Sequence, residues 1–339
     1  MAPIAFAHWR SPQTSGGNRY DDELIAGLPA AGVDLRVRPV KGAWPLPTDC
    51  ERRALLQLLA TGDEWLVDNI VGSAAPEAII DAVAEGRRVT LLMHYFPADD
   101  PSLSLEERAK LGASEGLAVR AASRLVVPSA WAAAEVAGRY GRADAVVARP
   151  GVSTGPGPGK SAGAPSLLWL SRLTPGKDPM TFIEALAHLP DLEWTARLVG
   201  PDDVDPTLTR LVVARIAELG LAGRVSVTGA RNGPALEAVW TGTDLLVHTS
   251  RAEMYGMVVA EAAARGIPSI VSGGTGAVEA QTSGAQFTPG DSVGLAAELR
   301  AWLTDAHVRR RWRAEALAGR AGIQTWSDTV ATVAAALRR

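Results

Sequence analysis

Residues 245–272 read LLVHTSRAEMYGMVVAEAAARGIPSIVS and form a complete strand–helix–strand pattern. The apolar run Leu245–Thr249 predicts a buried strand, and Ser269–Ser272 predicts a second one. Between them lies a segment of helical period, which stops at Gly266-Ile267-Pro268 because glycine and proline end helices. A strand, a helix and a second strand normally wind right-handed into a parallel sheet with helices on both faces. The stretch therefore predicts an α/β fold.

The same alternation of strands and helices extends from this stretch towards both ends of the chain. In the second half, further strands are expected at Leu167–Leu170, Thr195–Val199, Val225–Thr228 and Ala285–Thr288. In the first half, strands are expected at Pro3–His8, Val33–Arg38, Glu64–Asn69, Arg88–His94, Arg124–Val127 and Ala145–Ala148. One helix in the first half has a capping box at its start, Ser104 with Glu107. We expect two Rossmann-like doubly wound domains that face each other across a cleft.

A Gly/Pro/Ser tract separates the two halves of the pattern. Residues 150–165 read PGVSTGPGPGKSAGAP, which can form neither a helix nor a strand ladder. The chain has 339 residues, enough for two domains at roughly 100 to 200 residues each. We therefore predict an N-terminal domain at residues 1–150, a linker at 151–165, a second domain at 166–322 and a terminal helix within 323–339.

Composition and charge exclude several classes of protein. Hydrophobic residues make up 47% and charged residues 21%, which is typical of a globular chain and not of a disordered one. The formal net charge of −3 provides no basic field for nucleic acid. A single cysteine, Cys50, excludes an intramolecular disulfide and a thiolate metal cluster. No signal peptide or apolar membrane span is evident, so a cytoplasmic protein is expected.

Two features of the first half lie where strands are predicted to end. Ser15-Gly16-Gly17-Asn18 precedes a helix, and its glycines would let the backbone approach an anion, although a plain turn fits equally well. His94 follows an apolar strand, where a side chain that titrates near neutrality suits proton handling or hydrogen bonding. A histidine satisfied by neighbouring backbone is the alternative. His8 and His248 raise the same question more weakly.

Two cations follow the first strand of the second half. Arg172 and Lys177 stand five positions apart, on either side of a Pro-Gly turn. Arginine offers a planar fork for phosphate oxygens and lysine a compact charge, so the pair could neutralise a diphosphate without a metal. The alternative is an ordinary surface cation pair.

Two glutamates flank the predicted start of the helix in the opening stretch. Glu253 precedes Gly256, and Glu261 stands about one turn into the helix. Gly256 would admit a ligand to the helix N-terminus, where the amides of Met257 and Val258 could face a phosphate. The two carboxylates could then accept hydrogen bonds from sugar hydroxyls. Glutamates on a solvated helix face are the alternative, but they would not explain the glycine, the proline stop and the spacing.

These motifs resemble those of the retaining nucleotide-sugar glycosyltransferases of glycosyltransferase family 4, which have the two-domain GT-B fold. The resemblance is dense from Leu167 to about Pro289. It implies that Glu253 binds hydroxyls of the donor sugar and that Glu261 binds the ribose. It departs at Ser171, where the family often has glycine, and at Met254-Tyr255-Gly256, where it often has Gly-Phe-Gly.

The resemblance also implies roles for the remaining candidates. Arg172 and Lys177 would bind the diphosphate, the glycine loop of Gly16 and Gly17 would lie beside the donor phosphate, and His94 would lie near the reaction centre. Gly229 and Arg231 would lie at the nucleobase site. A helix around Ser327–Leu337 would cross back onto the first domain, with Trp326 near the crossing.

The implied activity is transfer of a sugar from a nucleoside-diphosphate sugar to an unidentified acceptor, with retention at the anomeric carbon. Neither a metal nor a bound cofactor is expected, and neither is a nucleic-acid partner. The protein would be a monomer or a weak oligomer. Two alternatives stay open: a nucleotide-sugar epimerase on a similar scaffold, and a non-catalytic two-domain sugar-binding protein.

Overall fold

The computed structural model describes residues 3–13, 15–157, 159 and 163–339. The chain divides into two compact units, each described here by itself. The first unit runs to Gly151 and also includes Gln324–Arg339, and the second unit is Val152–Ile323. Four residues of the linker predicted at 151–165, namely 158 and 160–162, lie outside the described residues.

The first unit is built on one parallel sheet. Its described strands pair in the order β2-β1-β3-β4-β5-β6, and their bounds are β1 Ile4–His8, β2 Leu35–Pro39, β3 Glu64–Asp68, β4 Arg88–Leu92, β5 Arg124–Val127 and β6 Val146–Val147. The strand order reverses at β1 and β3, and such a switch point opens a crevice at the carboxyl ends of the strands. The helices are α1 Gly16–Ala30, α2 Asp49–Leu59, α3 Asn69–Gly72, α4 Pro76–Ala84, α5 Leu105–Ala121, α6 Ala130–Tyr140 and α14 Trp326–Leu337.

The second unit repeats the design with the strand order of a dinucleotide-binding Rossmann domain. Its described strands pair in parallel in the order β12-β11-β10-β7-β8-β9, and their bounds are β7 Ser166–Leu170, β8 Thr195–Val199, β9 Val225–Val227, β10 Leu245–His248, β11 Ser269–Ser272 and β12 Gly284–Phe287. The switch point lies between β7 and β10. The helices are α7 Pro179–Ala187, α8 Pro206–Glu218, α9 Gly233–Thr241, α10 Met257–Arg265, α11 Ala277–Ala280, α12 Ser292–Thr304 and α13 Ala306–Gly319.

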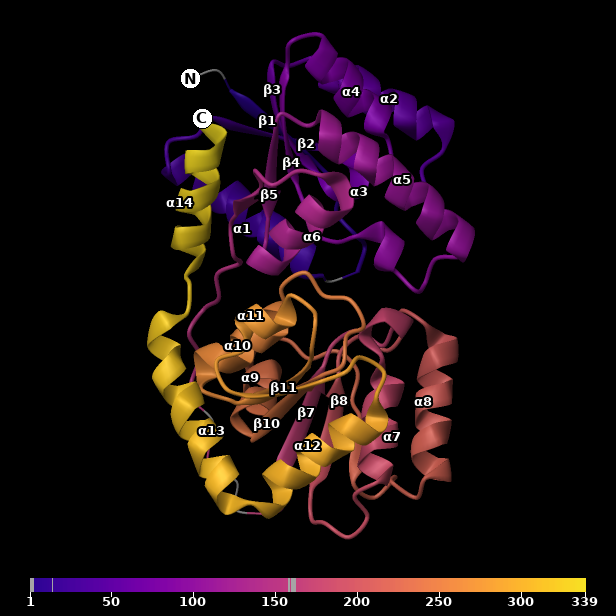
Figure 1. Ribbon diagram of the computed structural model, residues 1–339, viewed down its shortest axis with the longest axis vertical. Coiled ribbons are helices and arrows are strands. Elements are labelled where there is room, and N and C mark those ends of the chain that lie inside the picture. Colours follow the sequence, from indigo (N-terminus) through magenta and orange to yellow (C-terminus); the bar gives the residue numbers. More distant parts are fainter. Residues whose placement is uncertain (1–2, 14, 158, 160–162) are drawn as a thin grey trace. The chain divides into compact units, whose positions relative to one another are not determined.

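Alternating side chains of the strands place a core on each face of the second sheet. Leu167 and Trp169 of β7 join one buried cluster, whereas Leu168 between them joins another. Successive residues of a strand point to opposite faces, so a run that is apolar throughout requires helices on both sides. Figure 1 shows the helices flanking the strands in this way.

The core of the first unit includes the end of the chain. Val333 and Leu337 of α14 are buried with Leu24 and Leu28 of α1. In Figure 1, α14, drawn in yellow, lies beside α1. The Thr329 hydroxyl donates to the carbonyl oxygen of Arg149, 2.6 Å away. This helix is therefore a structural part of the first unit.

The predicted fold class is confirmed, because every predicted strand is present among the described residues within two positions of its expected bounds. The capping box of Ser104 and Glu107 is also confirmed at the start of α5. Two details differ. The strand expected to reach His94 ends at Leu92, and Gly16 and Gly17 are the first residues of α1 and not part of the preceding loop. Within the described part of the chain, no helix has the length and apolar character needed to cross a bilayer.

Candidate functional site

The switch point of the second sheet brings Lys177 and Glu253 together. Lys177 follows β7 and Glu253 follows β10, and these strands are hydrogen-bonded neighbours. The Lys177 ammonium donates to Oε2 of Glu253 across 2.5 Å, and the His248 ring nitrogen Nε2 lies 3.3 Å from the same oxygen. The lysine and the glutamate, 76 positions apart in sequence, therefore form an ion pair at one edge of the sheet.

The charge of Glu253 is maintained by its neighbours. Burial alone raises the pKa of this carboxyl group, but the positive charge of Lys177 and the contact with His248 outweigh burial and hold the pKa well below its usual range. Glu253 is therefore an anion at any physiological pH. A charged acceptor of this kind binds sugar hydroxyls more strongly than a neutral group does.

Asp178 and Thr249, which the sequence analysis did not single out, position this ion pair. Asp178 has φ of 49° and begins α7, and its carboxylate accepts hydrogen bonds from Thr181 and from Nε of Arg251 at 2.9 Å. The Thr249 hydroxyl lies 2.9 Å from the carbonyl oxygen of Lys177. These bonds attach the loop of Lys177 to the end of β10. The only signal in the sequence was that Asp178 and Thr249 are polar and lie beside the two motifs. Polar residues are too common in loops for this signal to identify them.

The N-terminus of α10 is open to an anion. Gly256 is its N-cap with φ of 81°, which favours glycine, and no side chain caps the helix. The N–H groups of Met257 and Val258 have no acceptor inside the helix and can face a phosphate. Glu261 is the fifth residue of α10, so its side chain tilts back over the same turn.

The backbone of Gly276 contacts the backbone of Glu253. Its N–H donates to the carbonyl oxygen of Glu253 across 2.7 Å. A Cβ on Gly276 would lie 2.0 Å from the carbonyl oxygen of Met254, so only glycine fits this approach. The sequence analysis did not identify this residue.

The other candidates of the second unit lie at the same edge of the sheet, because the carboxyl ends of parallel strands meet there. Arg172 follows β7 by two residues. Gly229 follows β9, and its carbonyl oxygen accepts from the N–H of Gly200 at 3.1 Å. Arg231 is exposed beyond it.

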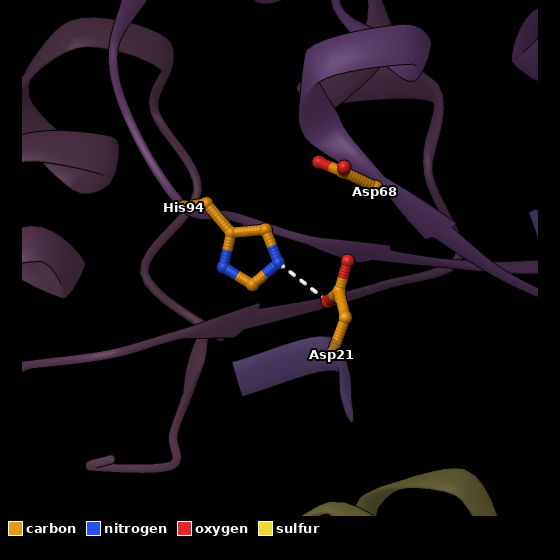
Figure 2. Close-up of side chains that lie close together, drawn as sticks. All are labelled: Asp21, Asp68 and His94. Atoms are coloured by element: carbon orange, nitrogen blue, oxygen red, sulfur yellow. Dashed lines mark hydrogen bonds and ion pairs between the residues drawn. The ribbon is translucent and has the colours of Figure 1, made fainter. Parts of the chain in front are cut away.

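In the first unit, His94 forms an ion pair with Asp21. Figure 2 shows Nε2 of His94 directed at Oδ1 of Asp21, and the two atoms are 2.8 Å apart. The His94 side chain is 7% exposed and that of Asp21 is 4% exposed. Gly17 is adjacent, since a Cβ on it would lie 3.5 Å from Cγ of His94. The structure thus brings Gly17 and His94 together and adds Asp21, which the sequence analysis did not identify.

The buried charges around His94 change its protonation. Burial lowers the pKa of His94, but the charge and hydrogen bond of Asp21, with a contribution from Asp68, raise it to about 9. The sequence analysis expected His94 to titrate near neutrality, whereas the charge of Asp21 shifts this pKa upward and favours the imidazolium form. Burial raises the pKa of Asp68 to about 7, partly offset by His94, and burial lowers the pKa of His8.

Asp21, Asp68 and His94 also each offer an atom that could ligate a metal, and these atoms lie within 4.8 Å of one another. Nε2 of His94 lies 2.8 Å from Oδ1 of Asp21, so the contact joins an imidazole nitrogen to a carboxylate oxygen. The observed contacts are thus those of an ion-pair network.

Comparison with known proteins identifies the family. Residues 157–318 match the profile of the glycosyl transferases group 1. The second unit belongs to this family. D-inositol 3-phosphate glycosyltransferase 1 of Catenulispora acidiphila is 33% identical over 253 residues, which cover 67% of this chain and 59% of that protein. Mannosylfructose-phosphate synthase of Agrobacterium fabrum is 32% identical over 112 residues, or 31% of this chain and 25% of that enzyme. The matches thus cover less than two thirds of these relatives' length.

Solved structures match both units of this chain in fold. Sucrose-phosphate synthase from Thermosynechococcus elongatus superposes with a TM-score of 0.82 at 17% identity, covering 100% of this chain and 98% of that one. HepE from Anabaena, in complex with UDP and glucose, superposes with a TM-score of 0.76 at 20% identity and covers 100% of both chains. At these identities the likeness shows the fold, and the expected GT-B class of fold is confirmed.

Proposed function

We propose that this protein transfers a sugar from a nucleoside-diphosphate sugar to an acceptor, with retention at the anomeric carbon and without a metal ion. The observation that carries the proposal is the uncapped N-terminus of α10 between Glu253 and Glu261, with Lys177 beside it. The family of the second unit and the names of its relatives support the same reaction class.

The donor diphosphate would be held by the start of α10 together with Arg172 and Lys177. Negative charge develops on the leaving phosphate oxygens as the glycosidic bond breaks. Preorganised N–H donors and cations at that position stabilise the transition state and lower the barrier. These groups supply the charge that a metal ion would otherwise provide, which is the physical basis for proposing a metal-independent reaction.

The two glutamates would bind different parts of the donor. Glu261 would accept hydrogen bonds from the ribose, and Glu253 from hydroxyls of the transferred sugar. Gly229 and Arg231 would border the nucleobase. These residues all follow the carboxyl ends of strands in one sheet, which is consistent with their binding one elongated ligand. The involvement of Gly16, Gly17 and His94 remains a prediction.

The proposed location is the cytoplasm. The single thiol, that of Cys50, is free and exposed, as a reducing compartment permits. The acceptor is left open, and a nucleotide-sugar epimerase remains the alternative activity. Transfer to an added acceptor, absent for an epimerase, distinguishes the two.

The test uses UDP and a panel of other nucleoside diphosphates. We expect the matching nucleotide to raise the melting temperature equally in EDTA and in magnesium. Lys177→Ala should weaken its binding by about 10- to 100-fold, the loss of one charge-assisted hydrogen bond of about 1.5–3 kcal/mol. Lys110→Ala, an exposed lysine, is the control. Stabilisation that requires magnesium would contradict metal independence.

Stereochemistry is tested separately. Once a donor and an acceptor are found, proton NMR of the product should show the anomeric configuration of the donor. An inverted linkage would refute the proposed retention.

A further inference from the structure

The two ring nitrogens of His94 have different surroundings. Its Nε2 is bound to Asp21, and none of the hydrogen bonds among the described residues uses Nδ1. In Figure 2, Nδ1 points away from both Asp21 and Asp68. The ring therefore has one nitrogen engaged with a carboxylate and one available to a ligand.

The surrounding elements hold the ring in this orientation. The backbone N–H of His94 donates to Oδ1 of Asn69 across 2.7 Å. The Tyr20 ring packs edge-on against the imidazole with 5.4 Å between centroids, and the Tyr20 hydroxyl donates to the carbonyl oxygen of Ala148. Gly17 of α1 also lies against the ring, since a Cβ on Gly17 would be 3.5 Å from Cγ of His94. Buried contacts of this kind restrict the imidazole to one rotamer.

Asp21 is the group that can keep this ring charged. Besides Asp21 on α1, the titratable groups around His94 are Tyr20 on α1, Asp68 at the end of β3 and, through Asp21, His8 on β1. His8 lies 3.9 Å from the second oxygen of Asp21, and burial lowers the pKa of His8, so that His8 does not neutralise Asp21 at neutral pH. Burial raises the pKa of Asp68 to about 7, so Asp68 is only partly charged at neutral pH.

We propose that Asp21 is a positioning residue that holds His94 as an outward-facing imidazolium, so that Nδ1–H donates a charged hydrogen bond to a substrate oxygen. His94 then acts as an electrostatic donor and not as a general base. The role for the substrate rests on the proposed glycosyl transfer, whereas the effect of Asp21 on His94 does not. An imidazolium aimed at an oxygen that gains negative charge stabilises the transition state more than the ground state.

The first arm of the test measures protonation without turnover. NMR of ¹⁵N-labelled histidine in the full-length protein, assigned with His94→Gln, should show His94 as an imidazolium from pH 6 to pH 8. In Asp21→Asn, which preserves shape and removes the charge, His94 should lose its proton within that range. A neutral His94 at pH 7 in the unaltered protein would overturn the proposal.

The second arm measures release of UDP from UDP-glucose against pH. At pH 8, Asp21→Asn should lower kcat by about tenfold or more, the effect of one charge-assisted hydrogen bond. At pH 5.5 the imidazole can take up a proton without Asp21, so the defect should shrink to about twofold. His94→Gln should be defective at both pH values. Asp22→Asn, an exposed neighbour paired with Arg10, should match the unaltered protein.

The two arms separate the possible failures. An equal defect of Asp21→Asn at both pH values would mean a structural role and overturn the positioning role. If the unaltered protein turns over neither UDP-glucose nor any other nucleotide sugar, the proposed function fails, and the NMR arm still decides whether Asp21 keeps His94 charged.

Discussion

At the scale of single residues, the ion pair of Lys177 and Glu253 bears directly on the proposed donor binding. The same ammonium that is proposed to bind a diphosphate already donates to a carboxylate 2.5 Å away. A nucleotide therefore has to compete with Glu253 for Lys177, and its phosphates are repelled by the carboxylate. If Lys177 binds the donor as proposed, binding involves an exchange of partners at Lys177.

This competition predicts opposite effects for the two glutamates. Glu253→Gln should tighten UDP binding by about tenfold, or about 1.4 kcal/mol, because Lys177 is released and a nearby negative charge is lost. The same variant should lose turnover and about 1–3 kcal/mol of stability, since a partly exposed ion pair is broken. Glu261→Gln should weaken UDP binding because the ribose loses an acceptor. Calorimetric titration of UDP into each variant compares the two affinities. A similar loss of UDP affinity in both variants would contradict the exchange of partners at Lys177.

At the scale of elements, a buried carboxylate joins three helices behind the loop of His94. Glu115 of α5 accepts hydrogen bonds from Asn69 and Ser73, at the start and the C-terminal cap of α3, each at 3.1 Å. Its other oxygen accepts from the Tyr140 hydroxyl of α6 at 2.6 Å. Asn69 in turn accepts from the backbone N–H of His94. The packing of these helices and the position of His94 are thus connected through one side chain.

Ionisation of Glu115 should make the first unit less stable at high pH. Burial raises the pKa of this group from 4.5 to about 7. Its contribution is therefore full below about pH 4.5 and is lost as the pH rises through 7, a total of about 3 kcal/mol. Glu115→Gln should flatten this dependence, because the amide can serve the same three partners with Tyr140 as acceptor. Denaturant unfolding at pH 5 and pH 8 measures the free energy of unfolding of the unaltered protein and the variant.

The matched control is Glu106→Gln, an exposed glutamate on the same helix. It should retain the pH dependence of the unaltered protein. A Glu115→Gln variant with the same loss of stability between pH 5 and pH 8 would show that Glu115 is ionised throughout.

At the scale of the whole molecule, each unit has its own core, and the first unit is built from two separate segments of the chain. Val330, Val333 and Leu337 of α14 complete the core that begins with β1 and α1. The core of the second unit is formed within Val152–Ile323. Damage to α14 should therefore affect the stability of one unit and leave the candidate site of the other in place.

Val333→Ala tests this separation. The side chain is fully buried, so its truncation should cost the first unit about 1–3 kcal/mol. Hydrogen exchange should accelerate in β1 and α1, while UDP affinity stays unchanged. Leu117→Ala, at a side chain 48% exposed in the same unit, should have little effect. Accelerated exchange throughout the second unit would contradict independent cores.

The sequence by itself determined the strands, the α/β class and the motifs of the second unit. These are local signals: apolar runs, helical period and glycine–proline stops report the structure of the residues that carry them. Glu253, Gly256 and Glu261 could be found because all three lie within one loop and the helix after it. Capping of α5 by Ser104 and Glu107 is local in the same way.

Only the tertiary structure decided which charges meet. The ion pair of Lys177 with Glu253 joins residues 76 positions apart, and that of His94 with Asp21 spans 73. Lys177 and Glu253 follow neighbouring strands at a switch point, and His94 follows β4 while Asp21 lies on α1, so the packing of strands and helices, which local pattern does not encode, brings each pair together. The protonation of His94 follows from that meeting, because a buried charge depends on the distance to its partner and on the exclusion of water.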